Sequence, residues 1–217
     1  MDIKTNKKVH TNSAIKIVEE IFNSIIHGIG AVAAITGLVL GIIFLILPTS
    51  SKIGFIIYAA SLIILMLAST LYHALTFTKA KKVFRAIDHS SIYILIAGSF
   101  TPFIIYLYSG WQQILFLTFI WIIAAVGITI TNTLVLPKNM KLIGVLIYIC
   151  FGWMSLIFIP KMGLLNIYII SLLLIGGILY TVGTIPFAFK KSFAHFSWHI
   201  FVIGAACAHF FAIISLS

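Results

Sequence analysis

Charged residues divide the chain into long uncharged, apolar intervals. Asp, Glu, Lys and Arg together occur only 18 times in 217 residues. Six uncharged intervals lie between them, at 21–51, 53–78, 89–137, 142–160, 162–189 and 192–217. A spanning helix needs about 20 apolar residues to cross roughly 30 Å of hydrocarbon, so five of these intervals can hold one helix each. The longest interval can hold two, because polar and glycine residues at 109–113 interrupt it.

This pattern predicts an all-α, polytopic membrane protein with seven transmembrane helices. We expect these helices near 23–46, 53–77, 88–108, 112–134, 141–159, 164–187 and 193–215. Before the first of them, apolar residues at 15, 18 and 22 are interspersed with charges, which is typical of a short amphipathic helix on the membrane surface. Residues 14–217 are therefore interpreted as a single seven-helix domain, and residues 1–13 as a tail that is disordered over most of its length.

The composition excludes a soluble domain. Apolar residues make up 62% of the chain and charged residues 8%, whereas an average soluble domain is roughly half apolar and a quarter charged. The two cysteines, Cys150 and Cys207, lie inside apolar stretches, which excludes a disulfide framework or a zinc ribbon. The net charge of +10 would suggest a nucleic-acid partner in a soluble chain. Here the basic residues fall in the loops, so we expect no nucleic-acid partner.

The basic residues are distributed unevenly between the two sides of the predicted membrane domain. Twelve of the 14 lie in the N-terminal tail and in alternate loops, whereas only Lys52 and Lys161 lie on the opposite side. Cytoplasmic loops carry an excess of Lys and Arg. The N-terminus and the tail are therefore expected in the cytoplasm and the C-terminus outside. The basic loops would then contact anionic lipid headgroups on the cytoplasmic side.

Three histidines are expected at one membrane depth. His73 ends the second predicted helix, and His195 and His199 open the seventh, so all three lie at cytoplasmic helix ends. The spacing of four residues places His195 and His199 on one helix face, where two imidazoles can share a metal ion. A single intramembrane histidine is more typical of a hydrogen-bonded packing residue. Three at one depth favour a zinc site.

Asp88 is the expected general base, because it is the only acidic residue after Glu20. Three neutral histidines leave one position of a tetrahedral zinc open, as in catalytic sites, and the aspartate would take a proton from the water bound there. Ser69 shares a helix face with His73, four residues later. It could hydrogen-bond a ligand or a developing oxyanion, and equally it could be a packing serine that bonds its own backbone.

Other polar residues are expected outside the ligand set. Glu20, Asn23 and His27 share one face of the first helix and could support the site from a second shell. His209 lies fourteen residues beyond His195, roughly 21 Å deeper in the membrane. This distance is too long for the same metal, so His209 is interpreted as a packed polar contact.

Four sequence blocks carry a resemblance to a known family. They are Glu20-x-x-Asn23-x-x-x-His27, Ser69-Thr70-Leu71-Tyr72-His73, Asp88-His89 running to Thr101-Pro102, and His195-Phe196-Ser197-Trp198-His199. In this order they resemble the bacterial hemolysin III family, within the progestin and adipoQ receptor group, and more distantly the alkaline ceramidases. The resemblance covers the chain from about residue 14 to its end.

The resemblance implies a zinc ion held by three histidines near the cytoplasmic face. Carried over residue by residue, His73, His195 and His199 would be the ligands, Asp88 would contact the bound water, and Ser69 would lie beside it. Together with the residue chemistry, this favours a zinc-dependent hydrolase in the bacterial cytoplasmic membrane that cleaves an amide or ester bond of a lipid.

Two other functions are considered. One is a non-catalytic, zinc-stabilised receptor or sensor of lipid state. The other is the pore-forming haemolysis that the family name implies. No predicted helix carries a continuous polar stripe that could line a wide channel, so the sequence does not favour a pore.

The expected orientation can be tested with reporter fusions. An alkaline phosphatase fused after Ser217 should be active because it is exported, and one fused at Lys82 should be inactive because it stays in the cytoplasm. Phosphatase activity normalised to fusion abundance is the measurement. The opposite pattern would place the histidines at the outer face.

Overall fold

The computed structural model describes residues 3–45, 48–133, 141–154, 159–188 and 192–216, and all regular secondary structure in these residues is helical. The helices are α1 (Ile3–Phe44), α2 (Thr49–Ala74), α3 (Lys81–Leu107), α4 (Gly110–Thr133), α5 (Lys141–Trp153), α6 (Ile159–Met162), α7 (Ile167–Gly183), α8 (Ile185–Ala188) and α9 (Ala194–Ile214). The expected all-α architecture is confirmed.

Within the described residues, five helical stretches are long and apolar enough to cross a membrane. They are Ala14–Phe44, Thr49–Ala74, Lys81–Leu107, Gly110–Thr133 and Ala194–Ile214. α5 and α7 are also apolar but shorter. The 17 residues of α7 extend about 25 Å at 1.5 Å per residue, less than the thickness of the hydrocarbon. Seven spans therefore stay a prediction, and part of the expected helix 141–159 lies outside the described residues.

The N-terminal segment differs from the expectation. The expectation of a separate amphipathic surface helix is wrong for the described residues, because α1 continues without a break from Ile3 through Phe44. No proline occurs in this segment and its first glycine is Gly28, so no helix-breaking residue separates the charged part from the apolar part.

The helix ends follow the turn chemistry of the sequence. A break between two helices in this interval is confirmed, but it lies at 108–109, since α3 ends at Leu107 and α4 begins at Gly110. Gly110 has a φ of +59°, a left-handed conformation that glycine adopts without a steric penalty. The expected helix 164–187 is interrupted at Thr184, just before Pro186. Proline lacks the amide that would continue the α7 ladder.

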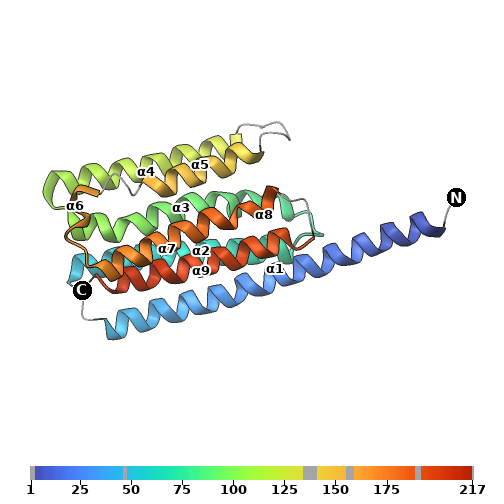
Figure 1. Ribbon diagram of the computed structural model, residues 1–217, viewed down its shortest axis with the longest axis horizontal. Coiled ribbons are helices and arrows are strands. Elements are labelled where there is room, and N and C mark those ends of the chain that lie inside the picture. Colours follow the sequence, from blue (N-terminus) through green and yellow to red (C-terminus); the bar gives the residue numbers. More distant parts are fainter. Residues whose placement is uncertain (1–2, 46–47, 134–140, 155–158, 189–191, 217) are drawn as a thin grey trace.

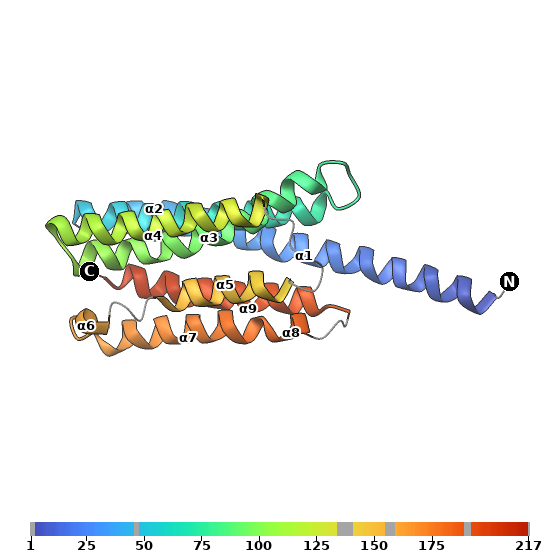
Figure 2. The same cartoon turned by 90° about the horizontal axis from the view of Figure 1, so that it is seen from above.

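The long helices lie side by side along a common axis (Figure 1). Figure 2 shows two layers, with α2, α3 and α4 in one and α5, α7 and α9 in the other. α1 packs against α2 and α9, α2 packs against α3, α3 against α4, and α7 against α9. The first part of α1 projects beyond the end of the bundle (Figures 1 and 2). α1 therefore contacts both layers near the site described below.

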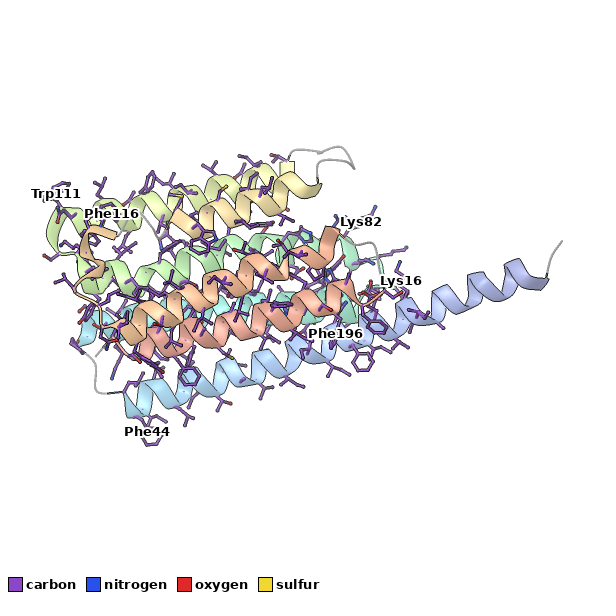
Figure 3. All side chains as sticks on the ribbon, in the orientation of Figure 1. Lys16, Phe44, Lys82, Trp111, Phe116 and Phe196 are labelled. Carbon is purple, nitrogen blue, oxygen red and sulfur yellow. The ribbon has the colours of Figure 1, made fainter. Side chains whose placement is uncertain are left out.

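The two ends of the bundle differ chemically. Lys16 and Lys82 lie at the end where α9 begins, and Phe44 and Trp111 lie at the opposite end (Figure 3). Along the sides, large apolar side chains are exposed, including Val32, Ile114 and Ile167. A water-soluble protein would bury such an area, whereas hydrocarbon solvates it. The long apolar helices and the exposed apolar side chains together indicate an integral membrane protein.

Small residues allow α2 and α3 to approach closely. A Cβ atom at Gly98 would lie 2.1 Å from Ser61 Oγ, and one at Gly54 would lie 2.9 Å from the Cα atom of Pro102. Close packing of small residues is a main source of helix association in lipid, where apolar burial between helices contributes little. This contact fixes α2 against α3, and with them the helices that carry His73 and Asp88.

Gly98→Ala should therefore destabilise the bundle, because the added methyl group needs space that Ser61 occupies. We expect a loss of about 1–3 kcal/mol in the free energy of unfolding, measured as a lower melting temperature in detergent. Gly144→Ala is the matched control, since no atom lies within 4 Å of its added Cβ. Equal melting temperatures for the two variants would contradict the tight α2–α3 contact.

Candidate metal centre

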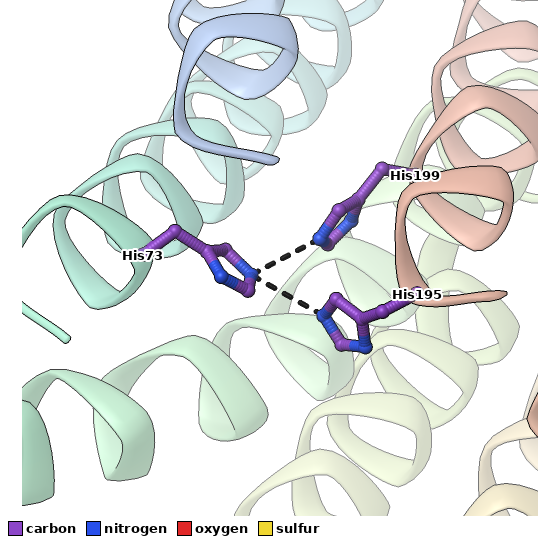
Figure 4. Close-up of side chains that lie close together, drawn as sticks. All are labelled: His73, His195 and His199. Atoms are coloured by element: carbon purple, nitrogen blue, oxygen red, sulfur yellow. Dashed lines mark hydrogen bonds between the residues drawn. The ribbon is translucent and has the colours of Figure 1, made fainter. Parts of the chain in front are cut away.

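The three sequence-predicted histidines converge at one end of the bundle (Figure 4). His73 Nε2 lies 3.2 Å from His195 Nε2 and 3.0 Å from His199 Nε2. One nitrogen from each ring lies within 4.8 Å of the others. His73 and His199 are buried and His195 is half-buried. Two helices far apart in the sequence, α2 and α9, thus aim imidazole nitrogens at a common point.

The start of α9 sets the position of two of these rings. Phe193 precedes the helix in a left-handed conformation with a φ of 62°, which costs a non-glycine residue roughly 1–2 kcal/mol. The Ser197 amide and hydroxyl both donate to the Phe193 carbonyl, at 2.9 Å and 3.0 Å. The Phe22 ring of α1 packs edge-on against Phe193 and Phe196. These contacts hold the first turn of α9 and therefore the His195 side chain.

Glu20 holds the third ring from the opposite side. Its Oε2 atom lies 2.5 Å from His73 Nδ1. A carboxylate only accepts hydrogen bonds, so this contact requires a proton on His73 Nδ1. A ring whose only proton is on Nδ1 presents a lone pair on Nε2. The Thr76 hydroxyl donates to Glu20 Oε1 at 3.3 Å. The proton position on His73 thus suits metal binding through the same nitrogen that faces the other two histidines.

Asp88 and Ser69 lie close to the histidines but outside the converging group. Both side chains are buried. Asp88 is near enough to His73 for their charges to interact, and it also interacts with Ser69. The Ser69 Oγ atom nevertheless forms no hydrogen bond of standard geometry with the described part of the chain. The structure therefore brings these two residues close to each other and beside the candidate site.

Asn23 and His27 face the site from α1. The His27 ring packs edge-on against the His199 ring, with 4.0 Å between centroids. Both residues are 2% exposed. Asn23 Oδ1 and both His27 ring nitrogens are buried without a hydrogen-bond partner among the described residues, as is His199 Nδ1. Such orphaned groups are rare in native proteins.

His209 lies apart from this site, as the sequence predicts. It packs against α7, with its ring centroid 5.6 Å from that of Tyr180. A Cβ atom at Gly176 would lie 2.4 Å from His209 Nε2, so the glycine leaves space for the imidazole. His209 is therefore a packing residue between α7 and α9.

The donor set fits a metal ion. Imidazole nitrogens are preferred by Zn²⁺ and other first-row transition metals rather than by Ca²⁺ or Mg²⁺, which take oxygen ligands. The carboxylate on the far nitrogen of His73 is the arrangement that commonly orients a metal-binding histidine. His73, His195 and His199 can thus hold one metal ion.

Part of this arrangement was not predicted from the sequence. The Glu20 carboxylate was expected to support the site, but its partner was not identified. Thr76 and Lys81 were missed. Thr76 follows His73 by three residues but lies in the turn after α2, which ends at Ala74. The position of Lys81 depends on the path of the turn between α2 and α3, for which no local sequence pattern exists.

The metal content of the purified protein tests the ligand assignment. We expect about one zinc ion per chain, as for a single three-histidine site. His199→Ala should remove nearly all of it, whereas His209→Ala should keep most of it. Elemental analysis gives the stoichiometry, and a thermal melt of each variant shows whether the fold persists. Equal metal loss in the two variants would contradict the assignment.

Comparisons with known proteins agree with the family that the sequence blocks indicate. The family model described as haemolysin-III related matches residues 15–210. A hemolysin-3 homolog of Bacillus subtilis (strain 168) is 40% identical over 202 residues, which cover 91% of this chain and 94% of that protein. Hemolysin-3 of Bacillus cereus is 39% identical over 91% of each chain. The human monocyte to macrophage differentiation factor, of the progestin and adipoQ receptor group, is 31% identical over 75% of this chain and 69% of its own length. With its four sequence blocks, its membrane helices and its histidine cluster, this chain belongs to the haemolysin-III related family.

Proposed function

We propose that this protein is a zinc-dependent integral-membrane hydrolase that acts on an amide or ester bond of a lipid. The observation that carries the proposal is the convergence of three imidazole nitrogens beside a buried aspartate that is not one of the converging groups. Three protein ligands with a separate carboxylate are typical of catalytic rather than structural zinc sites.

In this proposal each residue has a distinct task. His73, His195 and His199 hold the zinc ion. When bound, zinc supplies a Lewis acid that polarises a carbonyl group and makes water more acidic. Asp88 accepts a proton from the attacking water at a carboxylate oxygen and returns it to the leaving group. The Ser69 hydroxyl donates a hydrogen bond to the carbonyl oxygen as that oxygen gains negative charge.

A lipid substrate is supported by the surroundings of the site. The outer surface of α1 exposes apolar side chains near the site, among them Ile21, Phe22 and Ile25. A lipid can therefore approach from the side of the bundle without leaving the bilayer. The proposed location of the site is the cytoplasmic face, where the basic residues of the same end would contact anionic headgroups.

The alternative is a non-catalytic receptor or sensor in which the metal ion only joins α2 to α9. Its support is that the two helices meet at the histidines and at a hydrogen bond of 2.9 Å from the Tyr58 hydroxyl to the Ala206 carbonyl. A purely structural zinc is more often closed by a fourth protein ligand. The close group of donor nitrogens comprises three histidines and includes neither Asp88 nor His27, which favours the hydrolase.

Asp88→Asn separates the two functions. In a hydrolase the substitution keeps the shape of the side chain but removes the base, so hydrolysis should fall by about 10²–10⁴-fold while zinc content stays near that of the wild type. In a receptor the same change should alter zinc affinity or melting temperature, with no turnover to lose. Hydrolysis of fluorogenic N-acyl and ester lipids, zinc stoichiometry and melting temperature are measured together.

Two results would count against the proposal. A zinc-loaded wild type that cleaves none of a broad panel of amide and ester lipids would favour the receptor. An Asp88→Asn variant with full zinc and undiminished hydrolysis would keep the enzyme and reject Asp88 as its base.

A further inference from the structure

A continuous chain of polar contacts runs from the turn between α2 and α3 to the candidate metal centre. Lys81 Nζ donates to Thr76 Oγ1 at 2.5 Å, and the Thr76 hydroxyl donates to Glu20 Oε1 at 3.3 Å. The other oxygen of Glu20 contacts His73 Nδ1 at 2.5 Å. These contacts join α1, the last turn of α2 and the first residue of α3.

We propose that Glu20 is a positioning residue of the metal centre and that Thr76 and Lys81 hold its carboxylate in place. The inference rests on the proposed zinc site. It assigns to one lysine of the basic turn a role in metal affinity, whereas a lysine at a membrane surface would ordinarily contact lipid headgroups.

Glu20 acts through the orientation of the His73 ring. A metal-binding histidine usually donates its second N–H to a carboxylate, carbonyl or water, which fixes the tautomer and makes the ligating nitrogen more basic. Because Glu20 lies on α1, the ring is held by a helix other than its own. Without this carboxylate, His73 could rotate or exchange its proton between the two nitrogens, and either change would weaken a bound metal.

Thr76 and Lys81 restrict the carboxylate itself. A glutamate side chain has several rotatable bonds, and each oxygen of Glu20 has a different partner, which defines one orientation. Thr76 is 7% exposed, so its hydroxyl is shielded from competing water. The Lys81 ammonium also lies 5.7 Å from the centroid of the Tyr72 ring, a cation–π contact that keeps it directed inward.

Neighbouring residues provide matched controls. Lys82 carries the same charge as Lys81 but is exposed, and its label in Figure 3 lies at the outer edge of this end of the bundle. Glu19 has the same charge as Glu20 and points about 100° away around the helix axis. Each control therefore removes an equal charge at nearly the same membrane depth without breaking the chain of contacts.

The experiment measures zinc affinity of the full-length protein in detergent, by competition with a chromophoric chelator. Glu20→Gln should weaken zinc binding about 10–100-fold, the usual effect of losing an outer-shell partner. Thr76→Val and Lys81→Gln should give smaller losses in the same direction. Glu19→Gln and Lys82→Gln should stay within about twofold of the wild type, because neither side chain is one of the groups joined by these contacts.

A second readout distinguishes positioning from a general contribution to folding. The visible absorption spectrum of the Co²⁺-substituted protein reports the ligand field, so it should change in Glu20→Gln and remain unchanged in Glu19→Gln. A merely structural contact between α1 and α2 would instead lower the melting temperature of the metal-free protein and leave the spectrum intact, which would overturn the inference.

Failure of this inference differs from failure of the proposed function. A wild type that binds no zinc would overturn both. A wild type that binds zinc, with equal affinities in Glu20→Gln and Glu19→Gln, would overturn the role of Glu20 alone. Equal affinities in Lys81→Gln and Lys82→Gln would remove Lys81 from the chain of contacts.

Discussion

The convergence of three imidazoles is the interaction on which the rest of this end of the molecule depends. His73, His195 and His199 bring nitrogens to within 3.0–3.2 Å across two helices. Glu20 fixes the proton of His73 on the far nitrogen, so an unshared electron pair faces the other rings. In a low-dielectric membrane interior such a cluster of polar groups is costly unless it is satisfied. A bound cation would accept a lone pair from each of the three rings. The hydrogen bonds at the start of α9 and the contacts of α1 hold these rings in position.

Half of the acidic residues of the chain lie beside the candidate metal centre. The chain has only four, and two of them, Glu20 and Asp88, lie beside the histidines. A divalent cation held by neutral imidazoles keeps its double positive charge, and two carboxylates balance it. Charges inside a membrane protein are tolerated mainly when they are paired in this way. The carboxylates differ in position, however, since one contacts a ligand and the other lies beside the Ser69 hydroxyl. Glu20 is therefore suited to orienting His73, and Asp88 to the proposed proton transfer.

The sequence predicted those features that depend on a local pattern of residues. It did not predict contacts that depend on the path of the chain through a turn. The spacing of His195 and His199 places them on one helix face, and the polar break before Gly110 ends α3, so both features could be predicted. The depth of His73 followed from the distribution of charged residues. By contrast, no pattern indicates that the turn after α2 brings Lys81 back to Thr76. The amphipathic segment was expected as a separate helix because amphipathic periodicity reports which face is apolar and does not report where a helix ends. The shorter α5 and α7 show the same limit, since composition identifies an apolar stretch but not its helical length.

The position of the site along the bundle is consistent with the proposed lipid substrate. His73 lies in the last turn of α2 and His195 and His199 in the first turns of α9, so the imidazoles lie near one end of the bundle. In the proposed location at the cytoplasmic face, the site would lie near the amide or ester linkage of a lipid, which is between its headgroup and its acyl chains. A lipid would already be solvated by the exposed apolar side chains of α1 near these residues. The buried polar atoms of Asn23 and His27 have no hydrogen-bond partner among the described residues. A lipid linkage that carries both oxygen acceptors and a hydroxyl or amide donor could form hydrogen bonds with them.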